Sequence, residues 1–138
     1  MYEPIRSKSV HSMAVREDDF PHRSRREELE IRLAGHLTAL LTVTDELRAL
    51  SPDAALDDAA QHLSDQITRL RSGNRPLRAA PTSTGDHVAS RIAQLHQRAH
   101  TVAGNAMVVA TSCGDTAGAA LAAERMAAHA GALGIGAA

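Results

Sequence analysis

Apolar residues recur at alternating spacings of four and three along most of this chain, which is the period of an amphipathic helix. The first such stretch consists of Leu29, Leu33, His36, Leu40, Val43, Leu47 and Leu50. Leu37 and Leu41 widen its apolar face, as expected in a helical bundle rather than in a two-stranded coiled coil. Ser24 and Glu27 have the spacing of a capping box, so we predict that the first helix begins directly after Ser24.

A second helix follows almost at once, and it should form an antiparallel hairpin with the first. Ser51 is expected to cap this helix, with Pro52 at its first position, and Gly73 and Asn74 are expected to end it. Its apolar positions are Leu56, Ala60, Leu63, Ile67 and Leu70. Because the turn is very short, the two helices have to run in opposite directions.

Two more helices are predicted in the second half of the chain. The third begins near Asp86, and its apolar positions are Val88, Ile92, Leu95, Ala99, Val102, Ala106 and Val109. Asp115 is a suitable cap for the fourth, which runs to about Gly131. The apolar positions of this last helix are Ala119, Ala122, Met126, His129 and Leu133.

These elements predict an all-α fold, because no segment shows the alternating pattern of a strand. Residues 24–133 are expected to form a single, alanine-rich four-helix bundle domain, up-down-up-down by default. Residues 73–86 hold two Pro, two Gly and a Thr/Ser cluster, and this loop is long enough for either a crossover or an antiparallel return. We expect residues 134–138 to fray at the C-terminus.

Residues 1–23 show no sustained apolar period and are expected to form a flexible, disordered N-terminal tail. The alternative is an arm that orders on contact with a partner. Its apolar anchors would be Ile5, Val10, Met13, Val15 and Phe20.

The amino-acid composition argues against several classes of binding and metal site. The 138 residues include 27 alanines, and their net charge is −1, which disfavours a generic binder of nucleic acid or of anionic membranes. Tyr2 and Phe20 are the only Phe, Tyr or Trp residues, so no phenyl or indole ring beyond residue 20 can stack on a base. A lone cysteine, Cys113, excludes an internal disulfide and a zinc ribbon.

Some features of the sequence indicate the cellular location of the protein. Its longest uncharged stretch, residues 99–114, is too short and too polar to span a bilayer, and its first residues lack the apolar core of a signal peptide. We therefore expect a cytoplasmic protein without a membrane partner. Arginine outnumbers lysine 14 to 1, which together with the many alanines is typical of a GC-rich bacterial genome.

The third and fourth helices offer mostly Ala and Val, which bury less area than Leu or Phe, so an isolated monomer would be marginally stable. The spacing of Gly114, Gly118 and Ala122 also favours close helix contact. We therefore predict a non-enzymatic protein that acts through self-association and through binding a protein partner. The fourth helix is the first candidate for the interface, and no cofactor is predicted.

The eight histidines support an alternative. His96 and His100 are four residues apart, so they share one helix face, as in a chelating pair. In chain order the four helices offer His36, His62, His96 with His100, and His129. This order resembles the ligands of hemerythrin-like proteins, four-helix bundles with a di-iron site. The resemblance implies a metal site of His96 and His100, with His36 and His62 as additional ligands.

The chain departs from the hemerythrin pattern at two positions. Gln66 stands where that family has a glutamate, and Gly134 stands where it has an aspartate, so both bridging carboxylates are missing.

A third interpretation comes from Arg91 and His96, whose spacing resembles the Arg-x4-His motif of HEPN ribonucleases. The resemblance implies that Arg91 holds a phosphate and that His96 acts on the 2′-hydroxyl or on its leaving group. Ile92 occupies a position that is normally polar in that motif.

Overall fold

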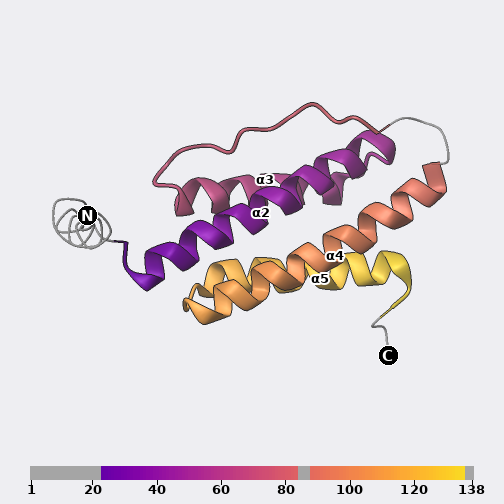
Figure 1. Ribbon diagram of the computed structural model, residues 1–138. Coiled ribbons are helices and arrows are strands. Elements are labelled where there is room, and N and C mark those ends of the chain that lie inside the picture. The colour runs from indigo at the N-terminus through magenta and orange to yellow at the C-terminus, as the bar shows by residue number, and fades with distance from the viewer. Residues whose placement is uncertain (1–22, 84–87, 136–138) are drawn as a thin grey trace, which may run out of the picture.

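The computed structural model describes residues 23–83 and 88–135 of the chain (Figure 1). This part contains four helices and no strand, which confirms the all-helical class. The helices are α2 (Arg25–Leu50), α3 (Ala54–Leu70), α4 (Val88–Ser112) and α5 (Thr116–Leu133). The predicted tail lies outside the described residues except for Arg23, and so does the predicted frayed end except for Gly134 and Ile135.

Two of the three predicted helix caps are confirmed. The Ser24 hydroxyl accepts a hydrogen bond from the backbone N–H of Glu27 at 3.0 Å, and the Glu27 carboxylate accepts one from the backbone N–H of Ser24 at 2.8 Å. Asp115 caps α5 by accepting from the backbone N–H of Gly118 at 2.9 Å. Each bond satisfies a backbone donor that the first turn of a helix leaves without a partner.

The predicted cap of the second helix is wrong. Asp53, not Ser51, caps α3, because its carboxylate accepts from the backbone N–H of Ala55 at 2.9 Å. Ser51 instead ends α2, with its backbone N–H bonded to the Leu47 carbonyl. Pro52 therefore lies in the turn between the helices rather than at the first position of α3.

The expected up-down-up-down order is also wrong, because α4 runs in the same direction as α3 (Figure 1). Arg69, near the end of α3, donates to Asp115 at the α4–α5 turn at 2.8 Å. At the other end of the molecule, the backbone N–H of Ser83, shortly before α4, donates to Glu46 near the end of α2 at 2.9 Å. The order is therefore up-down-down-up, with a crossover connection between the hairpins.

The crossover is physically feasible because the connection is long. Residues 71–87 can span about 55 Å when extended, whereas the 17 residues of α3 rise about 26 Å. Its described part is held along α2 by side chains: Arg78 donates to Asp45 at 2.6 Å, and the backbone N–H of Thr82 donates to Glu46 at 2.9 Å. The hydrogen bond from the Ser83 hydroxyl, more than any other contact, holds the pKa of Glu46 below its usual range.

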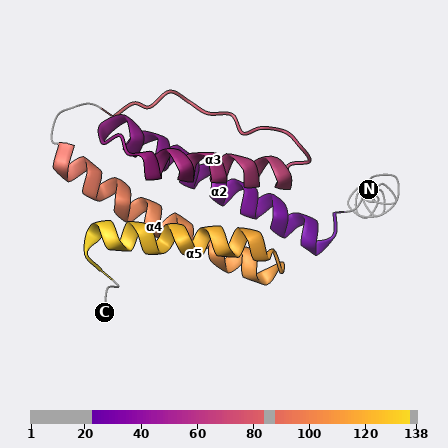
Figure 2. The same cartoon turned by 180° about the vertical axis from the view of Figure 1, so that it is seen from behind.

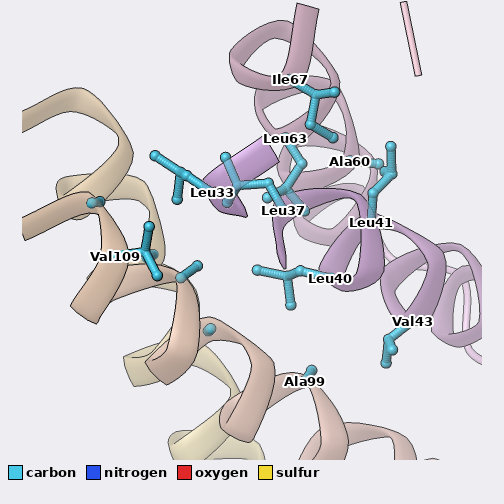
Figure 3. Close-up of a cluster of buried hydrophobic side chains, with 14 of the residues drawn as sticks. Leu33, Leu37, Leu40, Leu41, Val43, Ala60, Leu63, Ile67, Ala99 and Val109 are labelled. Atoms are coloured by element: carbon cyan, nitrogen blue, oxygen red, sulfur yellow. The ribbon is translucent and has the colours of Figure 1, made fainter. Parts of the chain in front are cut away.

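The hairpins α2–α3 and α4–α5 lie as two layers in both views (Figures 1 and 2). Figure 3 shows the core between them, where leucines of α2 face small side chains of α4. Fully buried large residues from the first hairpin are Leu33, Leu37, Leu40, Leu41, Leu47, Leu63 and Ile67. From α4 come Leu95, Ala99, Ala103, Ala106, Val109 and Ala110. The large side chains of one layer thus fill the space that the small ones of the other leave.

Candidate functional site

The structure pairs one predicted metal ligand with a histidine from another helix. His96 Nδ1 on α4 lies 2.9 Å from His129 Nδ1 on α5, and the ring centres are 5.1 Å apart. His129 has no exposed surface, whereas His96 is half-buried. The i,i+4 pair that the sequence singles out is therefore not the closest histidine contact.

Of the other predicted ligands, His36 and His100 are half-buried on α2 and α4, and His62 is exposed on α3. Within residues 23–83 and 88–135, no three side chains of His, Cys, Asp or Glu are grouped so that they could hold a metal ion. A metal site at His96 and His100 remains a prediction.

Arg125, which no sequence motif indicated, completes the cluster. It is only 5% exposed, and its Nη2 lies 3.4 Å from His129 Nε2. Its other described partner is Glu124, 3.3 Å from Nη1. Its Nε is buried and has no hydrogen-bond partner among residues 23–83 and 88–135. The available signal was helical register, because Ala122, Arg125 and His129 share one face of α5.

The guanidinium of Arg125 decides where the imidazole protons lie. Arginine only donates, so Nε2 of His129 accepts and the proton of His129 is on Nδ1. That Nδ1–H in turn donates to Nδ1 of His96, which leaves the proton of His96 on Nε2. We call Arg125, His129 and His96 the relay cluster.

Both imidazoles of the relay cluster are neutral at pH 7. Burial, and next the charge of Arg125, lowers the pKa of His129 to about 3, and the same two causes lower the pKa of His96. An imidazole with so low a pKa is a weak general base near neutral pH. The hydrogen bonds also occupy both nitrogens of His129, and the positive charge of Arg125 opposes a cation there.

The relay cluster lies in a pocket of about 300 Å³ between the two hairpins. The end of α2 and the start of α3 form one wall, and α5 forms the other. Asp53 and Glu124 both line it, so it holds two carboxylates beside one guanidinium. The cluster thus joins α4 to α5 at the point where α5 passes the α2–α3 turn.

The two residues of the ribonuclease motif have different neighbours. Arg91 Nε donates to the Ser83 hydroxyl at 3.4 Å, toward the crossover connection, whereas His96 bonds to His129 on α5. The structure therefore does not bring Arg91 and His96 to a shared site.

The outer side of α5 is the second candidate for a functional surface. Its exposed positions are Thr116, Ala117, Ala120, Ala123, Glu124, Ala127, Ala128, Gly131 and Ala132. Glu124 is the only charged residue among them. We call Ala120, Ala123, Ala127 and Gly131 the alanine face; they lie opposite the buried positions Gly118, Ala122, Arg125 and His129.

Gly118 and Ala122 face inward instead. A Cβ atom at Gly118 would lie 3.1 Å from Leu33 Cδ2, so the Leu33 side chain of α2 packs against the start of α5. Two members of the predicted small-residue spacing are therefore used within the chain.

Fold and site together define the class: a small all-helical protein of two packed hairpins, with a buried arginine–histidine cluster between them. No protein-family model matches this chain, and no curated protein or solved structure is significantly similar to it. None of the helices in the described part is both long enough and apolar enough to cross a membrane.

Proposed function

We propose that this protein is a non-enzymatic association module, which forms a homo-oligomer through the alanine face of α5 and binds a protein partner in that assembled form. The observation that carries the proposal is the near absence of charge on that face. A helix with one side in solvent normally carries polar and charged residues there. The exposed side of α3, with Asp57, Asp58 and Asp65, follows this rule, and α5 does not.

Alanine and glycine suit a helix–helix contact for two physical reasons. Their small side chains let two backbones approach closely, and neither loses side-chain entropy when it is buried. The net charge of −1 also means that two copies repel each other only weakly.

An interface on α5 alone would be small. The 18 residues of α5 form a helix about 27 Å long, and one such helix pair buries less than the roughly 1,200 Å² of a stable complex. The contact therefore has to extend onto α4. Val108, exposed on α4, lies level with Ala120 by register from the α4–α5 turn and is the first candidate for this extension.

The experiment is a mass measurement on matched variants. The wild-type chain is expected to be a dimer or larger in native mass spectrometry and analytical ultracentrifugation. Ala123→Glu with Ala127→Glu places two charges on the alanine face and should give a monomer with unchanged helical circular dichroism. Ala89→Glu with Ala93→Glu, an exposed pair of the same spacing on α4, is the control and should remain associated.

Two results would contradict the proposal: a wild-type chain that is monomeric at every concentration, or an α5 variant that associates like the wild type. The same native spectra, recorded without chelators, report any metal mass and so test the predicted site at His96 and His100.

A further inference from the structure

A groove of about 640 Å³ lies between the first half of α2 and the end of α3, away from the alanine face. Its apolar surface comes from Ile31, Ala34 and Leu70. Ile31, a large β-branched residue in the second turn of α2, is 52% exposed. Exposure of such a side chain costs hydrophobic free energy that a covering segment would recover.

The charged residues that line this groove are all positive. Arg23 and Arg71 contribute guanidinium groups, and no carboxylate is among the lining side chains. A segment that fits the groove should therefore combine an apolar anchor with acidic residues.

The chain itself supplies such a segment next to the groove. Arg23 lines the groove, and residues 1–22 join the described part at Arg23. Directly before it in sequence come Glu17, Asp18 and Asp19, followed by Phe20. This is the only run of three acidic residues in the N-terminal 22 residues, and it adjoins their only phenylalanine.

The chain between Phe20 and Arg23 is also long enough for Phe20 to reach the groove. Phe20 lies three positions before Arg23, so the two residues can be at most about 10 Å apart along an extended chain. Ile31 is six residues beyond the start of α2 and so lies about 9 Å along the helix axis. Because the tether is short, the local concentration of Phe20 at the groove is high, and docking needs few contacts.

We propose that residues 15–20 dock in this groove of their own chain, with Phe20 against Ile31 and Leu70 and with the carboxylates of residues 17–19 facing Arg71. This inference does not depend on association through α5. It assigns the N-terminal arm a binding surface within the molecule, which a partner would have to compete for.

A single fluorophore tests the proposal in the full-length chain. The protein has no tryptophan and one tyrosine, so Phe20→Trp introduces the only indole. If the arm docks, the indole emission shifts to the blue relative to the urea-unfolded chain, and acrylamide quenching falls about threefold because the ring leaves water. Ile31→Asp and Arg71→Glu, each added to Phe20→Trp, should abolish both effects.

Leu77→Asp and Arg98→Glu are the matched controls, because both positions are exposed and neither lines the groove. They should leave the emission and the quenching unchanged, and circular dichroism checks that all variants are folded. An indole that emits as in urea, or that ignores both groove variants, would overturn the proposal. An emission shift that disappears on dilution would also overturn it, because the arm would then occupy a second copy.

Discussion

A single arginine determines the chemistry of the buried histidines. Arg125 can only donate, so it fixes the tautomer of His129 and, through it, that of His96. The apolar period predicts that His129 lies on the inner side of its helix, and the structure confirms that it is buried. Arg125 was not foreseen, because an arginine beside an apolar row is usually solvent-exposed.

The relay cluster should make the stability of the protein depend on pH. The pKa of His129 is about 3 in the folded protein, whereas the usual pKa of histidine is about 6.5, so the unfolded state binds the proton more readily. Stability is therefore complete above about pH 6.5 and falls as the pH decreases toward 3. Between pH 7 and 4.5 we expect His129 to account for a loss of about 2.5 kcal/mol in the free energy of unfolding.

Urea unfolding at these two pH values measures the effect. His129→Gln retains an acceptor for Arg125 but cannot titrate, so it should lose less stability on acidification than the wild type. His62→Gln, at an exposed position, is the control and should behave like the wild type. Equal losses in wild type and His129→Gln would show that His129 is not the group that titrates.

For the individual helices, the cap was predicted correctly where the sequence offers only one suitable capping residue. The capping box at Ser24 and the cap at Asp115 depend on residues within one turn, and both are confirmed. The start of α3 failed, because Ser51 and Asp53 are both good caps two residues apart. The choice between them depends on where α2 ends, which local sequence does not reveal.

The caps differ in their tertiary contacts, and this difference predicts unequal costs. Burial raises the pKa of Asp115, but hydrogen bonds from Arg69 and from the backbone of Gly118 outweigh it and hold the pKa below its usual value. Asp115→Ala removes both the cap and the link to α3, so it should cost about 2–4 kcal/mol of unfolding free energy.

Asp53→Ala removes only an exposed cap and should cost about 1 kcal/mol. Chemical denaturation of both variants makes the comparison. Similar costs would mean that the Arg69–Asp115 contact adds nothing to stability.

At the scale of the whole molecule, the crossover determines which helices are neighbours. Because α4 starts beside the end of α2, the start of α5 reaches the end of α3, and the alanine face stays on the outside of the second hairpin. Residues 73–86 are long enough for either a crossover or an antiparallel return, so their local sequence does not determine the helix order.

Spin-label distances test the crossover directly. In a Cys113→Ser background, labels at Ala49 and Arg91 should be closer together than labels at Arg71 and Arg91, by about 20 Å, because α3 separates its two ends by about 26 Å. An up-down-up-down bundle would give the opposite order of distances.

The four helices, two of their caps and most of the buried apolar positions follow from the amino-acid pattern, because these depend on helical period and on contacts within one turn. The helix order, the pairing of His96 with His129 and the burial of Arg125 become visible only in the folded protein. Those features depend on which helix faces meet, and that follows from packing leucines of α2 against alanines of α4. The same packing leaves the alanine face of α5 and the groove beside Arg23 uncovered.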